Sequence, residues 1–144
     1  MERGHPRVLM PDSVRRGILH AARAGAPQEI CGLLEGPASG WATNWAVMNN
    51  GRSSPTAFLM DPREYRALER QADRAGLRLT GVFHSHPRGH SRPSRRDRDM
   101  VRRLEGTQGE WFYLICGLGE GEDVPMRAWQ MLEGRLREIP VILS

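Results

Sequence analysis

Apolar residues recur at helical spacing in three segments of this chain. The stripe that begins at Val14 predicts an amphipathic helix between Pro11 and Gly25. A second stripe predicts a helix that Pro62 opens and Gly76 closes, and a third predicts a helix that begins at Ser94. Each stripe needs a sheet or another helix to cover it.

Short apolar or alternating runs between glycines and prolines predict the strands. These runs are residues 7–10, 30–34, 41–48, 57–60, 80–84, 111–116, 126–132 and 136–143. The glycine- and proline-containing turn at 36–40 predicts a hairpin between the second and third runs. The last two runs are expected to be edge strands, with turns at Glu133-Gly134 and at Pro140.

Length and composition indicate one domain. The 144 residues contain 39% hydrophobic and 26% charged residues, which is ordinary for a folded domain. We see no internal repeat and no linker, so residues 1–144 are interpreted as a single domain of mixed α/β (α+β) class.

The expected cytoplasmic location and the expected reduced state of the cysteines agree with each other. No apolar run is long enough to cross a bilayer and the first residues contain no signal-peptide core, so a cytoplasmic protein without membrane attachment is expected. Cys31 and Cys116 lie in apolar stretches, where reduced cysteine packs as a small hydrophobic residue. A disulfide framework and a four-cysteine zinc site are therefore not expected.

The charge pattern does not favour nucleic acid as a partner. The chain has 21 basic and 17 acidic residues, and all the basic residues are arginine. It has no basic tail and no aromatic residues interleaved with basic ones, so nucleic-acid binding is the weaker interpretation. Salt-dependent binding to duplex DNA would support that interpretation again.

Chemistry concentrates after the predicted strand 80–84. His84 and His86 are two residues apart, so in a strand their side chains share a face, with Cα atoms about 6.5 to 7 Å apart. Ser94 is placed to cap the following helix, and Asp97 heads the stripe that Val101 continues. An inward carboxylate needs a cation or strong hydrogen-bond donors. Two histidines with one aspartate leave a fourth position open around a metal, as in catalytic zinc sites.

The spacing of these residues resembles the signature of the JAMM (MPN-type) metalloprotease family, with His84, His86, Pro87, Ser94 and Asp97 in the matching positions. The family also carries an upstream glutamate within Glu-x-Cys-Gly-Leu-Leu, and residues 29–34 of this chain read Glu-Ile-Cys-Gly-Leu-Leu. The resemblance implies a cytidine-deaminase-like sandwich, a mixed β-sheet with flanking helices.

The resemblance also implies roles for these residues. His84, His86 and Asp97 would bind Zn²⁺. Glu29 would take a proton from the attacking water and later give it to the leaving amine. Ser94 would steady the oxyanion, although a helix cap alone also explains Ser94.

The activity implied is that of a zinc metallo-isopeptidase or peptidase. Such an enzyme would cut after the C-terminal Gly-Gly of a ubiquitin-like or sulfur-carrier protein, as prokaryotic stand-alone members of the family do. Three alternatives stay open, namely a phage-tail-type processing peptidase, a non-catalytic scaffold domain and a nucleic-acid-associated domain. A homodimer is also left open.

Arginines are frequent in the loop between His86 and Ser94, which we call the site loop, and at the start of the last predicted helix. They are Arg88, Arg92, Arg95, Arg96 and Arg98. Two interpretations stay open, a solvated charged face or a surface that attracts an acidic carrier protein. Cations in the first turn oppose the helix dipole, so they call for a further reason.

Overall fold

The computed structural model describes residues 6–48, 61–108 and 110–144. The helices in this part of the chain are α1 (Asp12–Gly25), α3 (Pro62–Arg74) and α4 (Arg95–Gln108). The strands are β1 (Val8–Met10), β2 (Cys31–Gly36), β3 (Asn44–Val47), β4 (Arg78–His86), β5 (Phe112–Gly117), β6 (Met126–Leu132), β7 (Arg135–Ile139) and β8 (Val141–Leu143). None of these helices is long and apolar enough to cross a membrane.

Six strands form one mixed sheet in the order β3-β2-β4-β5-β6-β7. β4 and β5 are parallel, and the other neighbours in this sheet are antiparallel. Two parallel strands cannot be joined by a tight turn, so the chain crosses from β4 to β5 through a loop and α4. β1 and β8 form a separate two-stranded parallel sheet.

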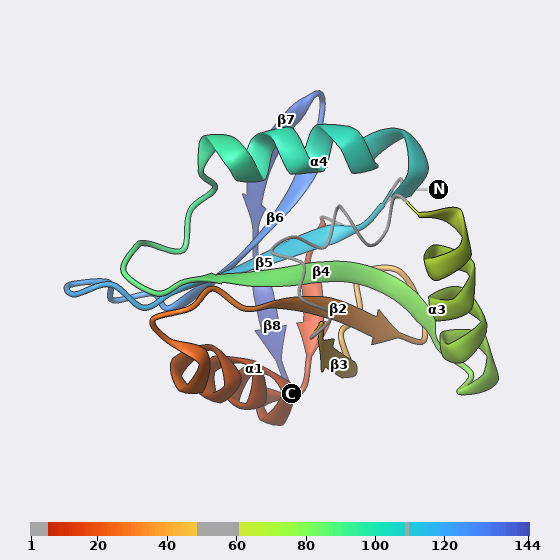
Figure 1. The fold of residues 1–144 in the computed structure, drawn as a ribbon, viewed down its shortest axis with the longest axis horizontal. Coiled ribbons are helices and arrows are strands. Elements are labelled where there is room, and N and C mark those ends of the chain that lie inside the picture. The colour runs from red at the N-terminus through yellow and green to blue at the C-terminus, as the bar shows by residue number, and fades with distance from the viewer. Residues whose placement is uncertain (1–5, 49–60, 109) are drawn as a thin grey trace.

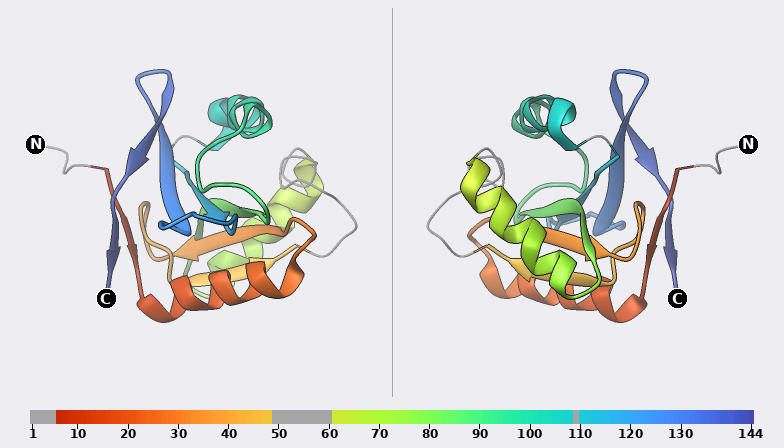
Figure 2. Two further views of the ribbon diagram at one scale, coloured as in Figure 1. Left: turned by 90° about the vertical axis from the view of Figure 1, so that its left-hand side faces the viewer. Right: turned by 90° about the vertical axis from the view of Figure 1, so that its right-hand side faces the viewer.

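Helices cover both faces of the large sheet. α1 lies on one side of it and α4 on the other, while α3 packs beside the start of β4 (Figure 1 and Figure 2). The mixed α+β class and the sandwich of a sheet with flanking helices are thus confirmed.

Side chains along β4 alternate between the two faces of the sheet, so the core consists of two hydrophobic clusters. Phe83 points toward α1 and packs in a cluster with Ile18 and Leu114. Val82 points the other way, into a cluster with Ala72 of α3 and Val101 of α4. His84 and His86 follow Val82 at intervals of two, so they continue the row that faces α4.

Local sequence accounts for the start of α3 and for the hairpin. The Asp61 carboxylate accepts the Arg63 N–H at 2.9 Å and Pro62 takes the first helical position of α3, as predicted. β2 and β3 pair antiparallel, which confirms the hairpin. A Cβ at Gly32 would collide with the Ala46 carbonyl and the Phe83 ring, so only glycine allows this close approach.

Some predicted boundaries were wrong. The third strand covers only Asn44–Val47, because Trp41 forms a single bridge to Leu9 rather than continuing the hairpin. β4 extends to His86, since pairing with β5 holds His84–His86 in the sheet.

The end of the chain also differs from the prediction. β6 lies between β5 and β7 and is not an edge strand. The run 136–143 divides at Pro140, which has no N–H to donate, and β8 pairs with β1 instead. The predicted strand at 57–60 lies outside the described residues.

Both cysteines are free and buried, as expected from the sequence. Burial raises the pKa of the Cys116 thiol to about 12, although Arg23 and Arg15 lower it slightly. Burial, and then the charge of Glu29, also raise the pKa of Cys31. A folded state that resists ionisation of these thiols keeps them protonated and unreactive near neutral pH.

We predict that Cys116 reacts with a thiol reagent at pH 8 only after unfolding. Because both thiols ionise more easily in the unfolded chain, stability should also fall as pH rises above about 8.5, the ordinary cysteine pKa. Thiol titration with and without urea, and urea midpoints between pH 7 and 10, measure both effects. A Cys31→Ala variant assigns the reaction to Cys116, and labelling of this native variant at the unfolded rate would contradict the prediction.

Candidate metal centre

The final residues of β4 carry two imidazoles on one face. His84 lies opposite Cys31 of β2 and Ile115 of β5, so strands on both sides hold its backbone. His84 is 9% exposed, and His86 is half-buried at the strand end. The ring centroids of the two histidines are 5.1 Å apart.

A capping box at the start of α4 orients the carboxylate. The Asp97 N–H donates to Ser94 Oγ at 3.2 Å, and the Ser94 N–H donates to Asp97 Oδ2 at 2.7 Å. Asp97 is 9% exposed, and Val101, one turn later, is 1% exposed. The inward stripe expected from the sequence is therefore confirmed at these two positions, and the carboxylate heads it.

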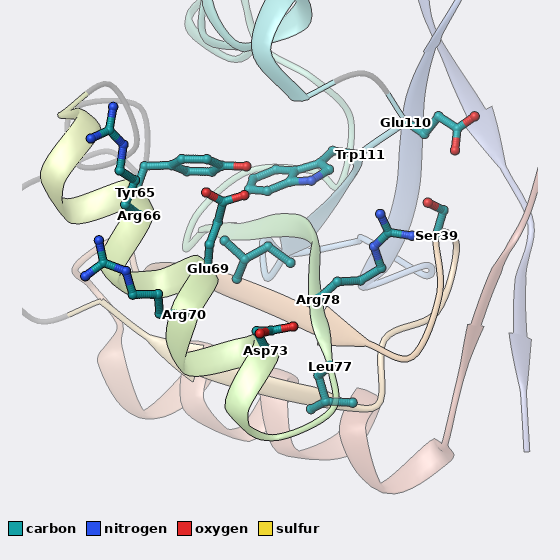
Figure 3. Close-up of a pocket in the computed structure, with 11 residues that line it drawn as sticks. Ser39, Tyr65, Arg66, Glu69, Arg70, Asp73, Leu77, Arg78, Glu110 and Trp111 are labelled. Atoms are coloured by element: carbon teal, nitrogen blue, oxygen red, sulfur yellow. The ribbon is translucent and has the colours of Figure 1, made fainter.

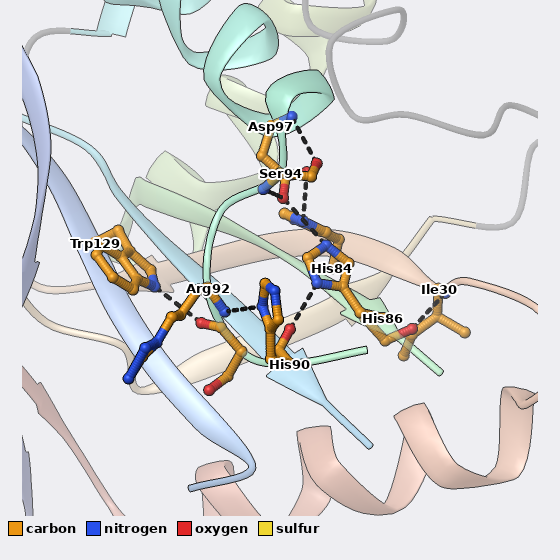
Figure 4. A network of polar contacts seen from close by, with 10 residues as sticks. Ile30, His84, His86, His90, Arg92, Ser94, Asp97 and Trp129 are labelled. Carbon is orange, nitrogen blue, oxygen red and sulfur yellow. Dashed lines mark hydrogen bonds and ion pairs between the residues drawn. The ribbon is translucent and has the colours of Figure 1, made fainter. Parts of the chain in front are cut away.

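These three side chains converge on one point (Figure 4). His84 Nε2 lies 2.8 Å from Asp97 Oδ1, and His86 Nε2 lies 3.1 Å from Asp97 Oδ2. One ligand atom from each residue lies within 4.8 Å of the other two. Residues separated by the whole site loop are thus brought into the arrangement that the sequence predicted.

Hydrogen bonding by His86 turns one ring nitrogen toward the carboxylate. His86 Nδ1 lies 2.7 Å from the His90 carbonyl oxygen, which accepts only if Nδ1 carries a proton. In a neutral ring, Nε2 then presents a lone pair to Asp97 Oδ2. Two lone pairs at this distance repel unless a cation or a second proton lies between them.

His84 supplies a test of whether a metal fits. Both of its ring nitrogens are buried without a hydrogen bond to any described residue. Nε2 is close to Asp97 Oδ1, but the two atoms lack the alignment of a hydrogen bond. Buried nitrogens without partners are costly, and a metal ion beside Nε2 would relieve that cost. The donor set of two imidazoles and a carboxylate therefore fits a divalent transition metal.

The electrostatics of the group agree with a cation site. Burial by itself would raise the pKa of Asp97, but the contacts with His84 and His86 and the Ser94 N–H hold it well below its ordinary value. The hydrogen bond to Asp97 raises the pKa of His86 against the opposing effect of burial. The carboxylate is therefore ionised at neutral pH, as a metal ligand must be.

Glu29 lies beside this group. The antiparallel register pairs Cys31 with His84, so extending it by two residues places Glu29 opposite His86. Its side chain is exposed, and its charge raises the pKa of both His86 and Cys31. The structure thus brings Glu29 to the edge of the group, while its catalytic role stays a prediction.

Ser94 is exposed at the start of α4. Its oxygen accepts the Asp97 N–H, and none of the hydrogen bonds between described residues uses its own O–H proton. The capping role is confirmed by this geometry. The oxyanion role stays a prediction that the geometry leaves room for.

Sequence reasoning missed Ser85, which ties Glu29 to the two histidines. Its Oγ accepts the Ile30 N–H at 2.9 Å, and its own N–H donates to the Ile30 carbonyl at 2.9 Å. Ser85 is 0% exposed and points away from the histidine face. A polar residue alternating with two candidate ligands was the available signal.

Sequence reasoning also missed the hydrogen bonds that hold the site loop at Ser91. Ser91 is 0% exposed, its hydroxyl donates to the Val124 carbonyl at 2.7 Å, and its N–H donates to Glu122 at 3.1 Å. Its carbonyl accepts from Trp129 Nε1 at 3.1 Å (Figure 4). These bonds span 31 to 38 residues along the chain, so no local pattern could reveal them.

Glycines on the segment that joins β5 to β6 allow the site loop to approach that segment closely. A Cβ at Gly117 would collide with the backbone of His90 and Ser91, and one at Gly119 would lie 2.8 Å from the Arg88 carbonyl oxygen. The site loop therefore rests directly on backbone, with its His90 carbonyl held toward His86.

A cavity of about 590 Å³ lies elsewhere, between α3 and the start of β4 (Figure 3). Its lining includes Tyr65, Glu69, Arg78 and Trp111. Arg78 and His86 mark opposite ends of β4, roughly 26 Å apart at about 3.3 Å per residue. This cavity is therefore separate from the group formed by His84, His86 and Asp97.

Comparison with known proteins shows to which family this chain is similar. The family model described as prokaryotic homologs of the JAB domain matches residues 11–132. The CysO-cysteine peptidase of Mycobacterium tuberculosis is 27% identical, covering 93% of this chain and 88% of that protein. The probable TtuB-protein conjugate cleaving protease of Thermus thermophilus is 34% identical, covering 78% and 80%.

Solved structures share the fold. A protein of Desulfitobacterium hafniense superposes with a TM-score of 0.74 at 29% identity, covering 95% of this chain and 92% of that one. A JAB1/MPN domain protein of Archaeoglobus fulgidus gives a TM-score of 0.60 at 18% identity, covering 96% and 100%.

The fold and its comparisons define a hydrolase of the JAMM metalloprotease class. The chain belongs to the family of prokaryotic homologs of the JAB domain. The resemblance seen in the spacing of His84, His86, Ser94 and Asp97 is thereby confirmed at the level of the family.

We predict that His84→Ala and Asp97→Asn each weaken metal binding by more than about 100-fold, because loss even of an outer-shell partner costs roughly 10- to 100-fold. Titration with zinc and metal analysis of the dialysed protein measure the effect. His90→Ala is the matched control, since it keeps the backbone carbonyl and its ring is outside the group. Equal metal content in all four proteins, wild type included, would contradict the assignment.

We predict that Ser85→Ala lowers the free energy of unfolding by about 1–3 kcal/mol, because the partly buried Ile30 N–H loses its side-chain acceptor. Urea unfolding measures the change. The exposed residue Ser39 provides the control, and Ser39→Ala should stay within about 0.5 kcal/mol of wild type. A Ser85→Ala protein as stable as the control would show that the bond contributes nothing.

Proposed function

We propose that this protein is a zinc-dependent peptidase that hydrolyses the amide or isopeptide bond after the C-terminal Gly-Gly of a ubiquitin-like or sulfur-carrier protein. The observation that carries the proposal is the convergence of His84, His86 and Asp97 beside Glu29, on the scaffold of this family. The names of similar proteins support the substrate class. They describe a CysO-cysteine peptidase, a TtuB-protein conjugate cleaving protease and, in Pyrococcus furiosus, a desampylase.

His84 and His86 would hold the metal through Nε2, and Asp97 through its carboxylate. When bound, zinc supplies a Lewis acid that polarises the substrate carbonyl and lowers the pKa of water toward about 7. The His90 carbonyl fixes the tautomer of His86, and the Ser94 N–H fixes the Asp97 carboxylate. These bonds orient the ligand atoms toward the point where the three side chains converge.

Glu29 is proposed to move the proton. An amine leaves an amide poorly unless it is protonated, so one group must accept a proton from water and deliver it to nitrogen. The exposed Glu29 carboxylate, opposite His86 in the register, can reach both water and a substrate bound from outside. Ser85 holds the adjoining Ile30 backbone and so limits how far Glu29 can drift.

Ser94 is proposed to donate its O–H to the oxygen that gains negative charge in the transition state. Its oxygen accepts the Asp97 N–H, and Ser94 is an exposed residue, so its hydroxyl is accessible to a bound substrate. A fixed donor costs little reorganisation when charge develops, which makes such a hydroxyl effective.

A cytoplasmic location and a homodimer stay predictions from the sequence.

We predict that Glu29→Gln lowers kcat by about 10²- to 10⁴-fold, because the amide cannot accept the proton. Zinc content should be unchanged, since Glu29 is not one of the three grouped residues. The assay follows release of a fluorescent amine from a ubiquitin-like carrier that ends in Gly-Gly. Glu35→Gln, at the far end of β2, controls for loss of charge on the same strand.

Full activity in Glu29→Gln would refute the proton-transfer role. A wild-type protein loaded with zinc that cuts no carrier in a panel of ubiquitin-like and sulfur-carrier fusions would refute the substrate class.

A further inference from the structure

The positive charge of this protein is concentrated in one segment. Residues 88–103 contain seven arginines and two aspartates, a net charge of +5, whereas the whole chain carries +4. The rest of the chain is therefore at −1. No aromatic residue other than histidine occurs in this segment.

Helix α4 turns its arginines outward. Asp97 and Val101 are buried against the sheet side, whereas the helix arginines are all exposed. We call these the arginine face: Arg95, Arg96, Arg98, Arg102 and Arg103. α4 stands on the side of the sheet opposite α1, with its outer side uncovered by any other described element (Figure 1 and Figure 2).

Parts of the arginine face oppose the stability of α4, although Asp99 lies four residues from Arg95 and from Arg103, where opposite charges attract. Arg95 and Arg96 lie in the first turn, where a cation opposes the helix dipole. Arg98 and Arg102 are four residues apart, where like charges repel. None of the arginine face forms an ion pair with another described residue.

The helices differ in how their arginines are balanced. Like α4, α1 has a net charge of +2, with three arginines and one aspartate. The arginines of α3 alternate with Glu64, Glu69 and Asp73, so its charges nearly balance. Net charge alone therefore does not distinguish α4, which differs in carrying five exposed arginines on the helix that begins at the metal centre. Because these arginines lie on the helix that carries Asp97, an anionic partner that comes to the site would meet them.

We propose that the arginine face docks an acidic surface of the folded carrier protein whose C-terminal tail enters the metal centre. The inference rests on the proposed function, because it names what holds the body of that substrate. One helix carries both groups, and its diameter of about 10–12 Å limits their separation near the first turn. A folded domain can therefore touch the arginine face while its tail reaches Asp97.

Arginine suits this partner. Its planar guanidinium binds carboxylates with two parallel hydrogen bonds, so a row of arginines recognises Asp and Glu side chains well. Nucleic acid fits less well, since single strands are bound by stacking on aromatic residues and residues 88–103 contain none besides His90. A surface of this kind speeds encounter and sets partner choice, and its effect falls with salt.

The test compares two charge reversals of equal size. Arg98→Glu/Arg102→Glu changes the arginine face away from the capping box, and Arg66→Glu/Arg70→Glu makes the same change on α3. The probes are a strongly acidic ubiquitin-like carrier ending in a Gly-Gly fluorescent amide, and a short peptide with the same ending. Both are assayed at 50 and 500 mM NaCl with zinc-loaded protein.

We expect the α4 variant to raise KM for the carrier at least tenfold at low salt, with kcat and cleavage of the peptide unchanged. The difference should shrink at high salt, and the α3 variant should behave as wild type. Equal KM values for the two variants would overturn the proposal. Binding of a 20-base-pair duplex that depends on the arginine face, with carrier cleavage unaffected, would also overturn it in favour of nucleic acid.

Equilibrium binding separates this inference from the proposed function. The carrier without a leaving group is titrated into wild type and both variants, followed by fluorescence anisotropy. If wild type binds the carrier through the arginine face but cuts neither probe, the docking surface stands and the proposed activity fails. If both probes are cut and binding is the same in all three proteins, the activity stands and the docking surface is refuted.

Discussion

Parallel pairing of β4 with β5 is the constraint on which the site depends. A parallel neighbour forces the chain to leave the end of β4, cross one face of the sheet and return, so the crossing helix must start near the strand end. His84 and His86 end the strand, and Asp97 begins the helix. Topology therefore joins the three side chains, and sequence spacing alone would not.

The same atoms hold the fold and form the site. The Asp97 carboxylate caps α4 through the Ser94 N–H while it faces both imidazoles. Ser85 joins β4 to the chain entering β2, and so relates Glu29 to the histidines. A domain of this size has few elements to spare, and here each bond near the centre acts on stability and on position together.

Much of this could be predicted, and the limits have a physical cause. Helices α1 and α3 follow from apolar spacing and end signals within a few residues. The grouping of His84, His86 and Asp97 follows from a predicted strand that ends at the histidines and a predicted helix that begins near the same end. The pairing of β8 with β1 joins the two ends of the described chain, and the bonds of Ser91 reach Glu122 and Trp129. Such contacts depend on the assembled fold, which no local pattern encodes. The assignment of Glu29 needed the family resemblance, since an exposed glutamate has no distinguishing spacing.

The glycines beneath the site loop constrain how this enzyme can diversify. Gly117 and Gly119 lie so close to the loop backbone that any side chain there would push it out of place. Variation on that side is therefore closed, whereas Arg88, His90 and Arg92 point their side chains to solvent and are open to change. New substrate preferences can arise on the outer rim of this loop while its underside keeps the geometry of the centre intact.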